Sequence, residues 1–217
     1  MNAYTLVIGN KAYSSWSLRP WLLMKEAGIG FEETRISLYQ KGAKESLLRH
    51  SGAGKVPVLR HGDLTVWDSL AICEYLAERH PGKRLWPADA AARAHARSIS
   101  AEMHSGFSNL RNQMPMNVRR RILNRAITPE ASVDIFRIKA IWEECLGRFA
   151  AAGPFLLGEF SIADAMYAPV VSRFHTYGVE LSGTADAYAR NILALTAFRQ
   201  WVADANAETE VAPQYEA

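Results

Sequence analysis

Three serines stand at the boundary between an apolar run and a helix-forming segment. Tyr4–Ile8 has the β-branched and aromatic composition of a short strand. Ser14, Ser15 and Ser17 follow it where helical spacing begins. The first N–H groups of a helix lack intrahelical acceptors and carry partial positive charge, so hydroxyls and N–H groups can converge here on one anionic atom such as a thiolate. Serines at a helix start are also ordinary N-caps, and capping is the alternative interpretation.

Such a site can supply the free energy that thiol ionisation needs. A free thiol has a pKa of about 8.5, so only a few per cent is ionised at neutral pH. Lowering the pKa by about 2 units requires roughly 2.7 kcal/mol of differential stabilisation. One or two charge-assisted hydrogen bonds, at about 1.5 to 3 kcal/mol each, together with a helix N-terminus are sufficient.

A second polar pair begins another predicted helix. Asp68 and Ser69 precede Leu70, Cys73 and Leu76, which have helical spacing, so the pair predicts an N-cap. The same helix end presents a hydroxyl and N–H groups that suit a carboxylate, while the Asp68 carboxylate suits an ammonium. The pair therefore fits a ligand that carries both charged groups.

These residues belong to alternating strand-like and helix-like segments over the first eighty residues. A proline is tolerated in about the first turn of a helix, so Pro20 places the first helix start near Ser15 to Ser17. His61-Gly62-Asp63 between two β-rich runs predicts a hairpin. The predicted strands are Tyr4–Ile8, Phe31–Leu38, Val56–Arg60 and Leu64–Trp67, and the predicted helices are Ser15–Ala27, Ala43–Arg49 and a helix from Leu70 that ends at His80.

The pattern changes after a segment rich in proline and glycine. Residues 81–87 contain two prolines and a glycine and predict a linker between a domain of residues 1–80 and a domain of residues 88–217. Helical signals dominate the second domain, which we expect to be all-α. Its predicted helices are Asp89–Met114, Pro129–Ala150, Ser161–Tyr177 and Leu193–Ala205.

The order β-α-β-α-β-β-α is that of the thioredoxin-like α/β fold, and an all-α domain behind it is the layout of cytosolic glutathione transferases. Four motifs resemble that family and together span nearly the whole chain: Tyr13–Arg19, Gly54–Leu59, Trp67–Leu76 and Phe160–Asp164. The first is most similar to the Ser-Ser-x-Ser signature of the zeta class, which includes maleylacetoacetate isomerases. Trp16 departs from that class, which usually has cysteine there. The last motif also reads as a capping box with Phe160 as its staple residue.

The resemblance implies a glutathione site. Ser14 is then the hydroxyl that stabilises the thiolate, with Ser15 beside it, although other classes of the family use a tyrosine near the first strand, as Tyr13 or Tyr4 could be. Asp68 and Ser69 would bind the γ-glutamyl group. Three further residues would complete the site: Lys55 near the glycyl carboxylate, Val56 against the cysteinyl backbone, and Pro57 through a cis Val56–Pro57 bond.

The electrophile subsite is less clearly marked. Apolar side chains suit the body of an electrophile and arginines suit an acidic one, so five residues are candidates: Trp16, Phe107, Arg111, Met114 and Arg173. Core or surface positions are the alternative for each. Zeta-class isomerases hold a substrate carboxylate with an arginine of a late helix, and Arg173 lies in the corresponding region.

Composition and charge argue against several other classes of protein. The chain has 217 residues and 49% hydrophobic residues, so a folded protein is expected. The net charge is 25 − 22 = +3, and the basic run Arg119–Arg121 is expected to be a solvated face, so we expect no nucleic-acid partner. No run has the roughly 18 apolar residues of a membrane span and no signal peptide is evident, so a cytoplasmic protein without a membrane partner is expected. Two distant cysteines and six scattered histidines indicate neither a disulfide framework nor a metal site.

The sequence therefore predicts a serine-type glutathione transferase that adds the thiolate to a soft electrophile. Glutathione is a co-substrate if the product is a conjugate, and a coenzyme if a maleylacetoacetate-like substrate is isomerised from cis to trans. The resemblance also implies a homodimer. The alternative is a non-catalytic relative that binds ligands or proteins. A disulfide reductase would need a nucleophilic cysteine where this chain has Ser14 to Ser17.

Overall fold

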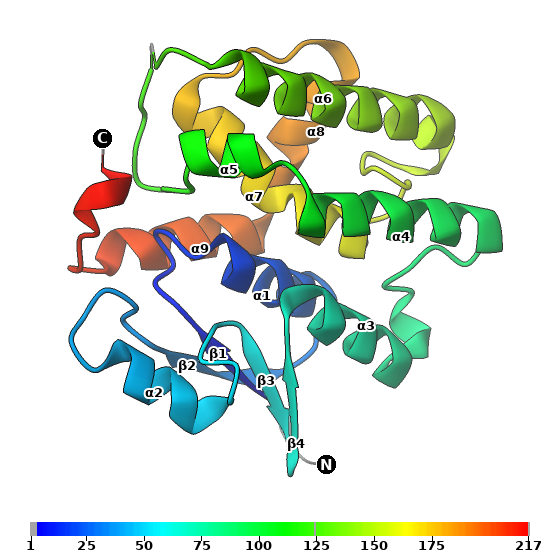
Figure 1. The fold of residues 1–217 in the computed structure, drawn as a ribbon. Helices are drawn as coiled ribbons and strands as arrows, with labels where there is room; N and C mark the ends of the chain where they lie inside the picture. The colour runs from blue at the N-terminus through cyan, green and yellow to red at the C-terminus, as the bar shows by residue number, and fades with distance from the viewer. Residues whose placement is uncertain (1–3, 124, 217) are drawn as a thin grey trace.

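The computed structural model describes residues 4–123 and 125–216. Figure 1 shows a small sheet with its helices below a larger group of helices. The first group consists of β1 (Tyr4–Ile8), α1 (Ser15–Glu26), β2 (Phe31–Arg35), α2 (Ala43–His50), β3 (Val58–His61), β4 (Leu64–Trp67) and α3 (Ser69–Arg79). The second consists of α4 (Ala90–Ser105), α5 (Ser108–Gln113), α6 (Pro129–Phe149), α7 (Ile162–Tyr177), α8 (Gly183–Ala194) and α9 (Thr196–Ala207). Short 3₁₀ turns lie at Pro81–Lys83, Ala150–Ala152 and Pro213–Tyr215.

The predicted order of elements in the first group is confirmed. The domain ranges 1–80, 81–87 and 88–217 stay predictions, and their outermost residues, 1–3 and 217, lie outside the described residues together with residue 124. Over the residues that the structure describes, no helix combines the length and apolar composition that crossing a membrane requires.

The sheet brings three loops to one of its ends. Its strand order is β2-β1-β3-β4, with β1 parallel to β2 and antiparallel to β3, and β3 antiparallel to β4. Val58 pairs with Val7 and with Trp67, so the end of β1, the start of β3 and the end of β4 are neighbours. The residues that follow β1, precede β3 and follow β4 therefore lie together, and these segments carry the predicted glutathione residues.

Two strand predictions need correction. The predicted strand Phe31–Leu38 ends at Arg35, because β1 ends at Ile8 and the last ladder-like bond runs from Ile36 N–H to the Ile8 carbonyl. Beyond it the chain turns, and Leu38 N–H donates to the Asn10 side chain. The predicted strand Val56–Arg60 is shifted to Val58–His61 because the backbone of β3 pairs with β1 only from Val58 onward.

The first helix begins where predicted, but its proline does not lie in the first turn. α1 starts at Ser15, with Ser14 as its N-cap. Pro20 is therefore the sixth helical residue, and the carbonyl of Trp16 loses its usual i+4 partner. The predicted hairpin is confirmed, with Gly62 at φ 60° in its two-residue turn.

The helical group also differs from its prediction. The predicted helix Asp89–Met114 is wrong, because Gly106 is extended and Phe107 adopts φ 57°, which separates α4 from α5. A side chain at Gly106 would come within 2.8 Å of the Glu102 carbonyl oxygen. The helix α8 was not predicted, because its buried face has two alanines and only two large side chains, Tyr188 and Ile192. The last helix begins at Thr196 rather than at Leu193.

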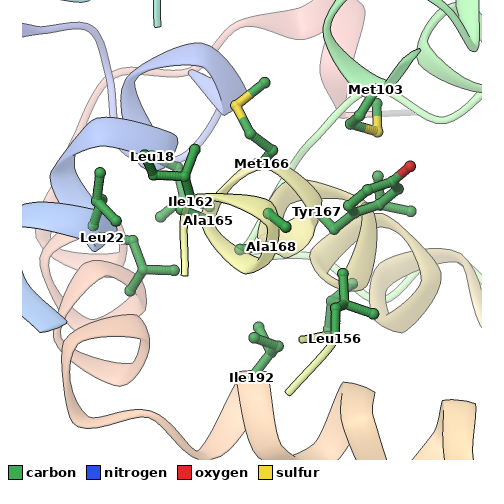
Figure 2. Close-up of a cluster of buried hydrophobic side chains, with 14 of the residues drawn as sticks. Leu18, Leu22, Met103, Leu156, Ile162, Ala165, Met166, Tyr167, Ala168 and Ile192 are labelled. Carbon is green, nitrogen blue, oxygen red and sulfur yellow. The ribbon is translucent and has the colours of Figure 1, made fainter. Parts of the chain in front are cut away.

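The two groups of elements share one hydrophobic core. Figure 2 shows Leu18 and Leu22 of α1 beside Ile162 and Ala165 of α7, and all four side chains are fully buried. The Nε–H of Arg19 also donates to the carbonyl of Met166 at 3.3 Å. Since α1 packs directly on α7, the N-terminus of α1 has a fixed position relative to the helical group.

Candidate active site

Two adjoining cavities lie at the end of the sheet where the three loops meet. The first has a volume of about 400 Å³ and the second about 740 Å³. Trp16, Lys55 and Val56 line both of them. Ser14, Ser15, Arg111 and Arg173 line the first cavity, whereas Asp68 and Ser69 line the second. The two cavities are thus parts of one cleft between the sheet and the helical group.

The hydroxyl of Ser14 is held at the N-terminus of α1. It accepts a long hydrogen bond from Ser17 N–H at 3.4 Å and donates to Ser17 Oγ at 2.8 Å. Ser17 is fully buried, and its Oγ accepts from Gly9 N–H at 3.1 Å. Ser14 is therefore an N-cap that also lines the first cavity, and its role as an anion-binding hydroxyl stays a prediction.

Ser15 is held by a buried arginine. The Nη2 of Arg173 donates to Ser15 Oγ at 3.2 Å, while its Nε donates to the Met114 carbonyl at 2.8 Å and its Nη1 to the Pro169 carbonyl at 3.3 Å. Burial lowers the pKa of Arg173 to about 10, with a further contribution from Arg111. The guanidinium stays charged at neutral pH and leaves the Ser15 O–H free to donate toward the cavity.

Trp16 is flanked by two more arginines. The guanidinium carbons of Arg19 and Arg111 lie 4.3 Å and 4.7 Å from its ring centroid. Burial lowers the pKa of Arg19 to about 9, helped by repulsion from Arg111 and Arg173. Among the described residues, Arg19 Nη1 and Arg111 Nε are buried without a hydrogen-bond partner. No aspartate or glutamate is among the described residues that line the first cavity, so its electrostatic potential favours an anion.

The hydroxyls of the two tyrosines considered from the sequence have other partners in this structure. Tyr13 lines the first cavity, but its hydroxyl donates to Glu216 Oε1 at 2.5 Å and accepts from Ala212 N–H and from Arg119 Nη2. Burial and the bond with Glu216 raise the pKa of Tyr13. Tyr4 lies at the start of β1, where its hydroxyl contacts His80.

Asp68 and Ser69 form the cap of α3 as predicted. Asp68 Oδ1 accepts from Leu70 N–H at 2.8 Å and Ala71 N–H at 3.4 Å, and Asp68 adopts φ 77°. Burial would raise the pKa of Asp68, but hydrogen bonds from His104 and Leu70 outweigh it and lower the pKa. Ser69 Oγ is buried without a hydrogen-bond partner among the described residues. An orphaned hydroxyl at a helix N-terminus suits a carboxylate oxygen.

The loop before β3 completes the second cavity. Lys55 is exposed at its rim, Val56 is half-buried and Pro57 is buried. The Val56–Pro57 peptide bond is cis, as expected from the resemblance.

Two candidates for the electrophile subsite lie elsewhere. Phe107 and Met114 are buried in the core shared with α4 and α6, and neither lines the two cavities. Their backbone contributes instead, since the Met114 carbonyl accepts from Arg173. Pro115 and Met116, the next residues in the chain, line the first cavity together with Tyr39 and Tyr215. No sequence motif marked these residues, because the loop after β2, the long connection after α5 and the C-terminal segment bring them there.

Comparison with known proteins gives two family models that match this chain. The model described as "Glutathione S-transferase, N-terminal domain" matches residues 13–79, and the one described as "Glutathione S-transferase, C-terminal domain" matches residues 125–204. The maleylacetoacetate isomerase of Rattus norvegicus is 33% identical over 191 residues, which cover 85% of each chain. A stringent starvation protein A homolog of Haemophilus ducreyi is 27% identical over 165 residues, covering 75% of this chain and 71% of the relative.

Solved structures show the same fold. A glutathione transferase homolog from Burkholderia, crystallised with bound glutathione, has a TM-score of 0.71 and 24% identity, and the match covers 96% of this chain and 100% of that one. A glutathione S-transferase from the Antarctic clam Laternula elliptica has a TM-score of 0.73 and 23% identity, with 96% and 95% covered.

Proposed function

This chain belongs to the glutathione S-transferase family, and we propose that it is a serine-type enzyme in which Ser14 stabilises the glutathione thiolate for addition to a soft electrophile. The observation that carries this proposal is the position of the Ser14 hydroxyl. It lies at the N-terminus of α1, on a cavity whose described lining residues include two arginines and one lysine and no acidic residue. Such a preformed anion site stabilises negative charge without reorganising during the reaction.

The residues of the second cavity fit the remaining groups of glutathione. The orphaned hydroxyl of Ser69 and the N-terminus of α3 suit the γ-glutamyl carboxylate, and the Asp68 carboxylate suits its ammonium. The backbone of Val56 would pair with the cysteinyl residue in the manner of an added strand. The exposed Lys55 would meet the glycyl carboxylate.

Ser17 and Ser15 would support Ser14 in different ways. With Gly9 N–H occupying its acceptor side, Ser17 can turn its own O–H toward Ser14 Oγ, which frees the Ser14 O–H for the sulfur. Ser15 accepts from the charged Arg173 and can donate a second hydrogen bond to the same anion. Two such bonds are worth about 3 to 6 kcal/mol before the cost of desolvation, which exceeds the need for a two-unit pKa shift.

We propose a carboxylate-bearing electrophile. Arg111 and Arg173 present guanidinium groups to the first cavity, and Trp16 offers an apolar face. In conjugation the sulfur forms a new carbon–sulfur bond as the π bond of the electrophile breaks, and a proton taken up by the neighbouring carbon completes the product. In isomerisation the thiolate adds to a cis double bond, the resulting single bond rotates, and elimination returns the thiolate and the trans product. The similarity to the rat maleylacetoacetate isomerase supports the second route, with glutathione as coenzyme.

The proposal includes a homodimer in the cytoplasm. The matches to both glutathione S-transferase family models support the homodimer that the resemblance implies. Both cysteines are free thiols, which is typical of a reducing compartment where glutathione is abundant.

The thiol pKa of bound glutathione tests the proposal directly. Ultraviolet difference titration from about pH 5 to 9 would follow the thiolate in complexes of wild type, Ser14→Ala, Ser15→Ala and Ser69→Ala. We expect wild type to lower the pKa by about 2 units and Ser14→Ala to lose most of that shift. Ser15→Ala should lose a smaller part, and Ser69→Ala should weaken binding while retaining the shift.

An unshifted thiol pKa in bound wild type would show that Ser14 is only a helix cap. The alternative of a non-catalytic relative that binds ligands or proteins would then be favoured, and retention on immobilised glutathione without turnover would support it. A shift that disappears in Ser15→Ala but persists in Ser14→Ala would exchange the roles of the two serines.

A further inference from the structure

His104 lies in the last turn of α4, where the helical group faces the cap of α3. Its Nε2 is 2.7 Å from Asp68 Oδ2, and its ring meets the Trp16 ring edge-on with 5.4 Å between centroids. Asp68 lines the second cavity, whereas Trp16 lines both. One imidazole of the helical group therefore contacts the walls of both cavities.

The hydrogen between His104 and Asp68 belongs to the imidazole. An ionised carboxylate only accepts hydrogen bonds, so the Nε2–H of His104 donates to Oδ2. The other oxygen of Asp68 accepts from Leu70 N–H of α3. Two different helices thus hold the two oxygens, and together they fix the rotation of the carboxylate.

The backbone conformation of Asp68 makes the hydrogen bond from His104 important. Asp68 has φ 77° and ψ 135°, a conformation that residues other than glycine rarely adopt. Such a conformation persists where surrounding contacts hold the residue in place. The cap bond from Leu70 comes from the helix that Asp68 begins, whereas the bond from His104 comes from α4 of the helical group.

The position of His104 depends in turn on Arg111, which lines the first cavity. Arg111 Nη2 donates to the carbonyls of Met103 and His104, the latter at 3.0 Å. These carbonyls belong to the last turn of α4, where they have no intrahelical donor. A chain of direct contacts therefore runs from Arg111 through His104 to Asp68.

We propose that His104 is a positioning residue for glutathione, which orients the Asp68 carboxylate toward the ammonium of the γ-glutamyl group. This inference rests on the proposed function and adds to the glutathione site a residue from the helical group. His104 acts through Asp68 and need not touch glutathione. Loss of its hydrogen bond leaves the charge of Asp68 in place but allows the carboxylate to turn away.

A pair of ligands that differ only at the ammonium isolates this role. Calorimetry would measure the dissociation constants of glutathione and of its analogue without the γ-glutamyl amino group. We expect wild type to prefer glutathione about tenfold, as one charge-assisted hydrogen bond allows. His104→Phe keeps an aromatic ring beside Trp16 but cannot donate, so the preference should fall to about threefold or less, with affinity for the analogue within about twofold.

Two further variants make the test specific. His104→Gln places an amide N–H₂ near the position of Nε2, so it should restore most of the preference for glutathione. Ser105→Ala is the matched control, because Ser105 is the exposed neighbour whose hydroxyl bonds only to the Ala101 carbonyl of its own helix. It should retain the full wild-type preference.

The outcomes separate this inference from the function on which it rests. A wild type that prefers glutathione, with the same preference in His104→Phe, would overturn the role of His104 and leave the proposed function intact. A wild type that binds both ligands equally would overturn the assignment of the ammonium to Asp68 and with it the role of His104. A wild type that binds neither would overturn the proposed function as well.

Discussion

Several polar side chains of this protein cap a helix and also line a cavity. Ser14 caps α1 and lines the first cavity, and Asp68 caps α3 and lines the second. A helix N-terminus needs acceptors for its N–H groups, and the same groups attract an anionic ligand. Substitution of such a residue therefore changes stability and binding together, so roles are best separated by measurements on the ligand, such as its thiol pKa.

Arg111 contributes charge to the first cavity and also holds the last turn of α4, and comparing a charged with a neutral electrophile separates these two contributions. The change Arg111→Gln should raise the KM for a carboxylate-bearing electrophile by about 10-fold to 100-fold, since one hydrogen bond between charged groups is lost. A neutral aryl halide should be affected by less than about threefold. Steady-state kinetics with both electrophiles measures the ratio. Arg111→Lys should not restore the wild-type KM for the carboxylate-bearing electrophile, because lysine lacks the planar guanidinium that binds the Met103 and His104 carbonyls.

The control for Arg111 is Arg190→Gln. Arg190 is exposed and pairs with Asp186 one turn before it on α8. Exposed pairs of this kind contribute little, so neither KM should change. Equal losses for the charged and the neutral electrophile in Arg111→Gln would contradict a carboxylate-binding role and point to a general disturbance of the cavity.

Site residues at helix starts could be predicted from the sequence, whereas site residues that come together only through tertiary packing could not. Ser14, Asp68 and Ser69 have local signals, because capping chemistry depends on neighbours in the chain. Phe107 and Met114 were expected near the electrophile because they are apolar, but the break at Gly106 turns them into the core. His104 had no signal at all, since its contact with Asp68 depends on how α4 packs beside α3.

At the scale of elements, the capping box before α7 is confirmed and is fully buried. Asp164 Oδ2 accepts from Ser161 N–H at 2.8 Å and from the Ser161 hydroxyl at 3.0 Å, while Oδ1 accepts from Leu156 N–H at 3.0 Å. The carboxylate joins the loop before α7 to the helix itself. Since α7 packs on α1, this cap contributes indirectly to the position of Ser14.

Asp164 predicts a defined dependence of stability on pH. Burial raises its pKa to about 6, above the value of about 3.9 for an exposed aspartate. A raised carboxyl pKa means that the folded chain holds the proton more tightly, so this stabilisation is complete below pH 4 and is lost as the pH rises through 6. The free energy of unfolding of wild type relative to Asp164→Asn should therefore decrease by about 2 kcal/mol between pH 4 and 6.5.

Urea denaturation of both proteins at several pH values measures this difference. Asp164→Asn should be the less stable protein throughout, by about 1 to 3 kcal/mol at neutral pH, because an amide cannot accept from all three donors. Comparing the two proteins cancels the titration of the other groups that they share. A difference that does not change with pH would contradict the raised pKa of Asp164.

Elements with strong patterns were predicted well, and those with weak patterns were not. The hairpin, α1 and α6 have turn residues or long apolar stripes. The helix α8 was missed because only two large side chains, Tyr188 and Ile192, mark its buried face. The single helix expected from Asp89 to Met114 was wrong because periodicity continues across Gly106, where the backbone of this chain turns.

At the scale of the whole molecule, the C-terminal segment Glu208–Glu216 crosses from the helical group to the loops of the sheet. Figure 1 shows it beside the loop that follows β1. Glu208 accepts from Lys11 N–H at 2.6 Å and Ala12 N–H at 3.2 Å. Glu210 binds the Ser37 hydroxyl and, at 2.9 Å, Arg35. The segment therefore links the helical group to the loops of the sheet, next to the first cavity.

Tyr215 is the residue of this segment that lines the cavity. Its ring packs against Tyr13 and Tyr39, with centroids 5.5 and 5.7 Å away. The sequence offered no sign of this contact, because it joins residues about two hundred positions apart. Tyr215 lines the first cavity, together with Ser14, Lys55 and Val56, but not the second, where Asp68 and Ser69 would hold the γ-glutamyl group.

Tyr215→Ala should therefore alter the choice of electrophile and leave glutathione binding unchanged. Loss of one aromatic contact is worth about 0.5 to 1.5 kcal/mol, so kcat/KM for a bulky electrophile should fall about twofold to tenfold. Tyr215→Phe keeps the ring and should behave like wild type. Kinetics with a bulky and a small electrophile, together with the dissociation constant of glutathione, measures both effects. A weaker affinity for glutathione in Tyr215→Ala, with both electrophiles affected equally, would mean that the segment only holds the fold together.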